Sequence, residues 1–147
     1  MNILSKIYSL SPKIEHCEDE TRASISFLGQ EFVGWATLHP DDQDFQSNLI
    51  GASIAHMRAL MSCFEFYTCK YEQDYLLLKD LVGQAKYVNN TGATEFLTRK
   101  MWRAHNRMKL FQAARKEMKT SLCAYLKGQE KAFETLRRII RAKEDNK

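Results

Sequence analysis

The sequence predicts an α+β fold, in which a small antiparallel sheet is packed by a helix and followed by a largely helical C-terminal half. Residues 22–38 hold two alternating apolar and polar runs around a turn that carries Gly. From residue 48 the apolar residues recur every three or four positions, which is the period of a helix. Residues 95–127 contain neither Gly nor Pro and keep this spacing. The length of 147 residues, with 44% hydrophobic and 27% charged side chains, suits a folded domain of ordinary size.

The N-terminal part is expected to begin with a short amphipathic helix within the first ten residues, ending before Ser11-Pro12. The acidic stretch 15–20 reads as a loop or a strand end. Strands at 22–28 and 31–38 then form a hairpin, and Gly29-Gln30 between them would fit a two-residue type II′ turn. Gly34 lies inside the second strand and indicates a bulge or the close approach of another backbone.

A helix is expected over residues 48–88, capped by Ser47 or Asn48 after His39-Pro40 ends the strand. The β-prone aromatic run 64–67 leaves two end-to-end helices, broken near 64–70, as the alternative to one. Its apolar seam is Ile50, Ile54, Met57, Met61, Phe64, Tyr71, Tyr75, Leu78 and Val82.

The C-terminal half follows a turn cluster at 87–92, with Thr94 as the expected cap. Either one coiled-coil-like helix runs to about residue 143, or two helices pack as a hairpin around Gly128. We expect an α+β unit at 1–90 and a basic helical region at 94–145, packed as one domain. The heptad seam is Leu97, Met101, Ala104, Met108, Phe111, Met118, Leu122, Tyr125, Ala132, Leu136 and Ile139, with Arg115 and Gln129 as its polar positions.

Residues 22–60 resemble a ββα unit found in small bacterial and phage-encoded proteins of unknown function. The matching positions are Gly34, Ala36, His39, Pro40, Asp41, Asp42, Ile50, Gly51, Ile54, Ala55, Arg58 and Ala59. The resemblance implies a fold similar to a double-stranded-RNA-binding domain, with Gly51 and Ala55 letting the helix approach the sheet. Arg58 is expected to pair with an acid or to lie across the hairpin. Proteins of this kind are often interaction proteins, including inhibitors of host defence systems.

Charge is divided unevenly along the chain. Residues 1–94 hold 7 basic and 12 acidic side chains, whereas residues 95–147 hold 15 basic and 6 acidic ones. Such a basic half favours contact with nucleic acid or an acidic partner, and the alternative is a solvated outer face with a buried Trp102. The expected binding residues are Arg99, Lys100, Trp102, Arg103, Arg107, Lys109, Arg115, Lys116 and Lys119, which we call the basic stripe; a second cluster is Arg137, Arg138, Arg141 and Lys143.

Catalysis has little support, because the sequence contains no nucleophile elbow, glycine-rich phosphate loop or zinc-protease motif. His39 with Asp41, Asp42 and Asp44 resembles a metal or acid–base cluster, but a strand-ending turn followed by helix-start acids explains it as well. We therefore expect no enzyme, no catalytic residues, no metal and no cofactor. The cysteines (Cys17, Cys63, Cys69 and Cys123) are expected to be reduced and mostly buried.

The expected function is that of a non-enzymatic binding protein of phage or mobile-element type. Its basic C-terminal helices would engage nucleic acid or a nucleoprotein enzyme, and an inhibitor of a host defence nuclease, similar to an anti-CRISPR protein, is one concrete form. No signal peptide or apolar run of membrane-spanning length is evident, so we expect no membrane partner and a place in the cytoplasm of a bacterial host cell. The alternative is a homo-oligomeric structural protein that uses the heptad seam to form a homodimer without nucleic acid.

Overall fold

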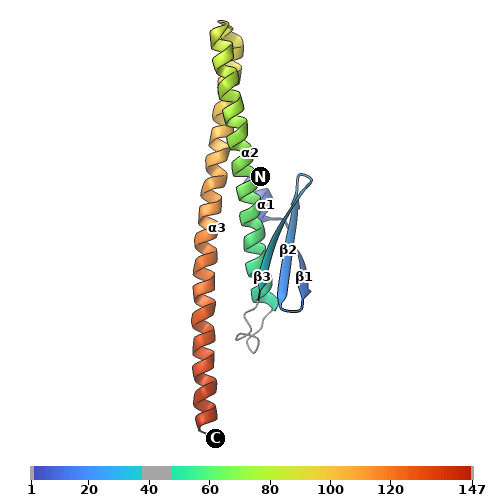
Figure 1. Cartoon of the computed structure of the whole chain (residues 1–147), viewed down its shortest axis with the longest axis vertical. Helices are drawn as coiled ribbons and strands as arrows, with labels where there is room; N and C mark the ends of the chain where they lie inside the picture. The colour runs from blue at the N-terminus through green and yellow to red at the C-terminus, as the bar shows by residue number, and fades with distance from the viewer. Residues whose placement is uncertain (1, 38–47, 147) are drawn as a thin grey trace. The chain divides into compact units, whose positions relative to one another are not determined.

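The computed structural model describes residues 2–37 and 48–146. The chain has an α+β fold, as the sequence predicts, and it divides into two compact units. One unit comprises residues 1–61 and 117–147, and the other comprises residues 62–116. The elements in chain order are α1 (Ile3–Tyr8), β1 (Lys13–Cys17), β2 (Glu20–Phe27), β3 (Gln30–Thr37), α2 (Asn48–Tyr87) and α3 (Thr91–Asp145) (Figure 1).

The short helix α1 confirms the expected N-terminal helix. The Asn2 side chain caps it, because its Oδ1 accepts a hydrogen bond from the Ser5 backbone N–H at 2.8 Å. Ile7 is fully buried and anchors the helix in the core of its unit.

The three strands form an antiparallel sheet in the order β1-β2-β3 (Figure 1). Of the two alternatives for residues 15–20, the strand end is right for residues 15–17, because β1 ends at Cys17, and only the pair 18–19 turns. The alternation of apolar and polar residues does not reveal β1, because the strand is short. Only Ile14 and His16 lie on its inward-facing side, where they pair with Ala23 and Thr21. Pairing with β2 in the tertiary fold makes this segment a strand.

The β2–β3 turn also differs from the prediction. The loop residues are Leu28 and Gly29, with φ values of 50° and 79°, and Phe27 pairs with Gln30. Positive φ at both positions is the pattern of a type I′ turn rather than the expected type II′ turn at Gly29-Gln30. The observed register places Ala23 beside Gly34, so two small residues lie together where a helix approaches the sheet.

Close packing of α2 on the sheet confirms the predicted roles of the small residues. A methyl group on Gly34 would overlap the backbone of Ala55 and Ala59, and one on Gly51 would meet the Thr21 hydroxyl. Ala23, Ala36 and Ala55 form a buried cluster, with Ile14 and Ile54 packed against it. Arg58 lies across the hairpin, as expected, and its Nη1 donates to the carbonyl oxygen of Trp35 at 2.6 Å.

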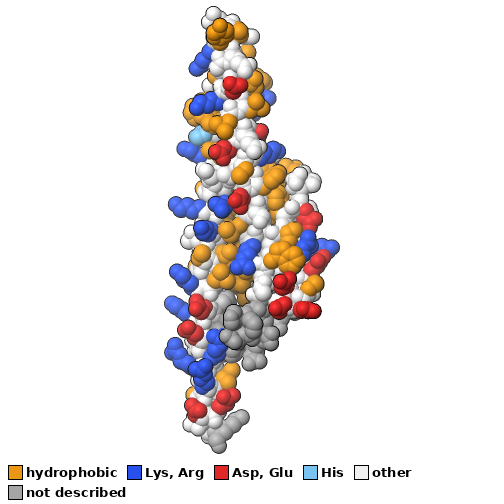
Figure 2. Space-filling view, viewed as in Figure 1, with side chains coloured by type: hydrophobic (Ala, Val, Ile, Leu, Met, Phe, Trp, Pro, Cys, Tyr) orange, Lys and Arg blue, Asp and Glu red, His pale blue; other side chains and the backbone are white. Residues whose placement is uncertain are grey.

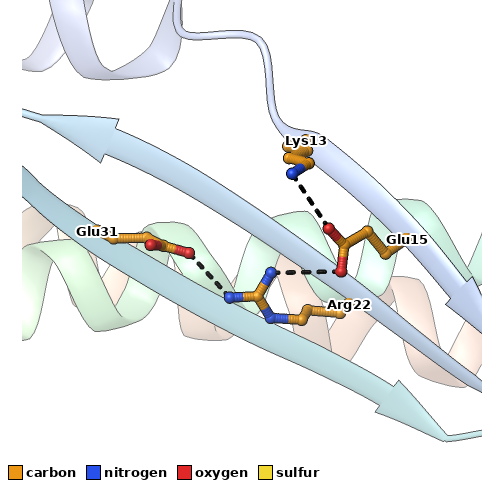
Figure 3. Close-up of polar contacts among 4 residues, drawn as sticks. All are labelled: Lys13, Glu15, Arg22 and Glu31. Atoms are coloured by element: carbon orange, nitrogen blue, oxygen red, sulfur yellow. Dashed lines mark hydrogen bonds and ion pairs between the residues drawn. The ribbon is translucent and has the colours of Figure 1, made fainter.

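The outer face of the sheet carries a chain of ion pairs (Figure 3). Glu15 contacts Lys13 at 3.3 Å and Arg22 at 3.5 Å, and Arg22 contacts Glu31 at 2.8 Å. The Arg22 guanidinium also lies over the Trp35 ring, at 5.9 Å from its centroid. These contacts join all three strands through their side chains.

In the unit of residues 62–116, α2 and α3 pack around an aromatic cluster. The Phe111 ring is fully buried, with centroids of Tyr67, Tyr71 and Phe64 at 5.2, 5.8 and 6.1 Å. Each helix is continuous, so the possible break near 64–70 and the break at Gly128 are both absent. Burial of Phe64 and Tyr67 three positions apart on one face explains why their β-propensity is overridden.

The connection between the two long helices is short, and Asn90 caps α3. Its Oδ1 accepts from the Ala93 N–H at 3.1 Å, whereas Thr94, the expected cap, lies inside the helix and donates its hydroxyl to the Asn90 carbonyl. Asn89 adopts a positive φ of 57°, which Asn tolerates well. Among the described residues, no helix is long and apolar enough to span a membrane.

Candidate nucleic-acid interface

All nine residues of the basic stripe lie on α3, and eight of them belong to the unit of residues 62–116. Lys119 belongs to the other unit. No Asp or Glu occurs between Phe96 and Lys116, so this part of the helix carries cations without carboxylates of its own. Lys and Arg side chains project along the helix in Figure 2.

Two parallel rows of side chains form a shallow groove on this surface. Arg99, Arg103 and Arg107 are spaced by four and make one ridge, with a rise of about 6 Å between neighbours. The second ridge is also spaced by four, and the groove between them is lined by Thr98, Arg99, Trp102, Arg103, Asn106, Arg107 and Leu110. We call this feature the α3 groove.

Trp102 is exposed at 50%, so the alternative in which it is buried is wrong. Its ring meets His105 edge to face, with 5.4 Å between centroids and an interplanar angle of 87°. His105 in turn lies 5.0 Å from the ring of Tyr75 on α2. The indole therefore packs against His105, which packs against Tyr75, while half of the Trp102 side chain remains exposed to solvent.

The arginine ridge also borders α2. Arg103 and Arg107 line a second hollow with Lys100 and with Tyr71 and Asp74 of α2. Arg107 lies over the Tyr71 ring at 5.6 Å, and Lys100 lies over Phe96 at 4.8 Å. Aromatic contacts hold these cations without neutralising them, so their positive charge stays available to a ligand.

The remaining stripe residues do not join the groove. Arg115 lies 3.9 Å from Glu65 in an exposed pair, which contributes little stability in water. Lys109, Lys116 and Lys119 are exposed but line neither hollow. The structure thus gathers Arg99, Trp102, Arg103 and Arg107, with Lys100 at the border, and separates the other four.

Four residues of this surface are absent from the sequence prediction: Phe96, Thr98, Asn106 and Leu110. Phe96 and Leu110 are exposed apolar side chains, and Asn106 offers an amide inside the groove. A signal for two of them was present, because Trp102, Asn106 and Leu110 are spaced by four and must share a ridge beside the arginines.

The metal or acid–base cluster considered in the sequence analysis gains no structural support. His39, Asp41, Asp42 and Asp44 lie outside the described residues, and within the described part of the chain no three metal-ligating side chains cluster.

The prediction that the cysteines are mostly buried is wrong. All four cysteines are free thiols, but Cys17, Cys69 and Cys123 are exposed and only Cys63 is buried. Burial raises the pKa of Cys63 to about 12, so this thiol is not a nucleophile near neutral pH.

Comparisons with known proteins identify neither a family nor a similar fold for this chain. No family model matches the sequence, and no curated protein or solved structure shows significant similarity to it.

Proposed function

We propose that this chain is a non-enzymatic binding protein that grips the phosphate backbone of nucleic acid through the α3 groove. The observation that carries the proposal is the ridge of Arg99, Arg103 and Arg107 beside an exposed Trp102, on a stretch of helix without carboxylates. Guanidinium groups bind phosphate oxygens in a bidentate manner and stack on bases. Arg99 and Arg103 form no ion pair with another described residue, so a ligand does not have to displace a carboxylate from them.

The test is fluorescence anisotropy with labelled DNA and RNA, for the natural chain and a variant with Arg99, Arg103 and Arg107 changed to Glu. If all three contact phosphate, log Kd changes with log salt with a slope of about 2 to 3, so raising salt from 50 to 200 mM weakens binding roughly 20- to 40-fold. The triple variant should lose this binding. Unchanged affinity in the triple variant would remove the groove from consideration.

A matched control makes the same change of charge elsewhere in the same unit. Lys70, Lys79 and Lys86 lie on α2, and changing all three to Glu alters the net charge by the same amount as the arginine variant. This control should retain most of the affinity, whereas a purely non-specific charge effect would weaken both variants equally.

One concrete form of this function is inhibition of a host defence nuclease by a phage or mobile-element protein, which the resemblance of residues 22–60 supports. A basic surface is repelled by the basic channel of such an enzyme and attracted to the nucleic acid that the channel holds. The inhibitor would therefore grip the bound nucleic acid. Loss of inhibition in the arginine variant, but not in the lysine control, is the expected result of a cleavage assay.

A second candidate function, homo-oligomerisation, is favoured by a separate observation. The heptad seam is buried at Phe111 and Leu122, but Leu136, Ile139 and Ile140 near the end of α3 are 42% to 47% exposed. A second copy would cover this apolar stripe. Light scattering would then show a dimer that survives high salt and dissociates when Leu136 and Ile139 become Glu, while Lys131→Glu leaves it intact.

A further inference from the structure

The side chains of the α3 groove offer one contact for each part of a nucleotide. Arg99, Arg103 and Arg107 supply charge for phosphate, and the exposed indole of Trp102 supplies a flat apolar surface for a base. Asn106 lies on the same ridge as Trp102 and lines the groove, and its amide can donate to and accept from a base edge. The exposed side chain of Leu110 also lines the groove and adds to its apolar surface.

An exposed indole among arginines gains little from a duplex. In a duplex the flat faces of the bases are stacked on each other, and only phosphates, sugars and base edges are available. In a single strand the base faces are free, and each base stacked on an aromatic side chain typically strengthens binding by about 5- to 150-fold.

The surroundings of the arginine ridge also disfavour entry into a duplex groove. Arg103 and Arg107 line a hollow together with Tyr71 and Leu78 of α2, so α2 flanks the ridge on one side. Two packed helices, with axes about 8–10 Å apart and each about 10 Å wide, span close to 20 Å. The major groove of B-DNA is only about 12 Å wide. The ridge would thus bring α2 against the duplex backbone before it reached the bases.

We propose, on the basis of the function proposed above, that the ligand of the α3 groove is single-stranded nucleic acid. The strand follows α3 over the roughly 12 Å from Arg99 to Arg107, with one base stacked on Trp102. The arginines contact the phosphates, and Asn106 contacts the edge of a base in the groove. Because every base has a flat face, this arrangement binds many sequences with modest preference.

The experiment uses Trp102 itself as the reporter. The chain has a second tryptophan, Trp35, on the sheet, so the full-length Trp35→Phe variant makes Trp102 the only indole. Its fluorescence is titrated with a twelve-nucleotide oligothymidine and with a twelve-base-pair duplex at 50 mM salt. We expect quenching by the single strand and an affinity at least tenfold higher than for the duplex.

Variants of Trp102 then separate stacking from charge. Trp102→Ala should weaken single-strand binding at least fivefold and leave the salt slope unchanged, whereas Trp102→Phe should keep most of the affinity. Variants of the arginines should instead lower the salt slope by about 0.7 for each residue removed. Circular dichroism of each variant confirms that the helices are retained.

The outcomes distinguish the two proposals. Duplex bound as tightly as single strand, without quenching of Trp102, overturns the single-strand inference and leaves phosphate binding by the arginines in place. Absence of any salt-sensitive binding to either nucleic acid overturns both proposals, and the exposed Trp and Arg would then be assigned to a protein partner.

Discussion

Substitution of Gly34 by Ala tests the packing of α2 against the sheet. The added methyl group would overlap the backbone of Ala55 and Ala59, and backbone atoms of a helix cannot rotate away as a flexible side chain can. Overpacking of a core typically costs about 1–3 kcal/mol. We expect the upper end of this range, because the helix or the strand must shift as a whole to make room.

The assay is urea unfolding followed by the fluorescence of Trp35, the strand neighbour of Gly34, in a background where Trp102 is Phe. With an m value of about 2 kcal/mol/M, a loss of about 3 kcal/mol lowers the midpoint by roughly 1.5 M. Gly83→Ala is the matched control, since Gly83 lies inside α2 and, apart from the adjoining stretch of the helix, no atom of the described residues lies within 4 Å of the new methyl group. That control should stabilise the chain by about 0.5–1 kcal/mol. A Gly34→Ala midpoint equal to that of the natural chain would refute the close approach described here.

The other predictions concern the turn, the aromatic cluster, a histidine and the end of α3. Leu28 is exposed with a positive φ, so Leu28→Asn should raise the free energy of unfolding by about 1 kcal/mol in urea titrations; a decrease would contradict the assigned turn. Phe111→Ala should cost about 3–5 kcal/mol, and a loss below 1 kcal/mol would mean that the ring is not buried. Burial lowers the pKa of His56 below its usual 6.5, so His56 of the unfolded state binds a proton at a higher pH than His56 of the folded state. The contribution of the neutral His56 to folding stability is therefore present above pH 6.5 and is lost as the pH falls below 6.5. His56→Phe should reduce the drop in Tm between pH 7 and pH 5, and an unchanged drop would assign it to other groups. Gly128→Ala should raise the Tm of the chain slightly, because, apart from the adjoining stretch of the helix, no atom of the described residues lies within 4 Å of the added methyl group, and a lower Tm would contradict this.

The sequence predicts the helices well because their apolar seams are long. Phe64 and Phe111 belong to seams of many members, so a single β-prone run or one glycine does not change the outcome. For the opposite reason the sequence indicates only the end of β1, and it places the β2–β3 turn one residue too far along the chain. β1 is only five residues long. The position of the turn depends on how α2 packs over Ala23 and Gly34, and the local sequence holds no information about that packing.

The candidate site was predictable to the extent that helical periodicity determines it. The spacing of four places Arg99, Arg103 and Arg107 on one face, and the structure agrees. Periodicity could not show that Trp102 stays exposed, nor that Arg115 lies toward Glu65, because both depend on where α2 lies beside α3.

The hydrogen bond from Arg58 to Trp35 has a consequence for self-association of the sheet. A two-residue turn makes Phe27–Gln30 a hydrogen-bonded pair, and by alternation Arg22–Trp35 is a non-hydrogen-bonded pair, whose backbone groups point away from each other. The Trp35 carbonyl therefore faces the outer edge of β3, which pairs with no other strand of the described residues and where an added strand would bond. Arg58 already occupies that acceptor, so another polypeptide must displace a guanidinium before it can add a fourth strand. The Arg58 side chain, which links α2 to β3, thus also disfavours the pairing of another strand with the edge of β3.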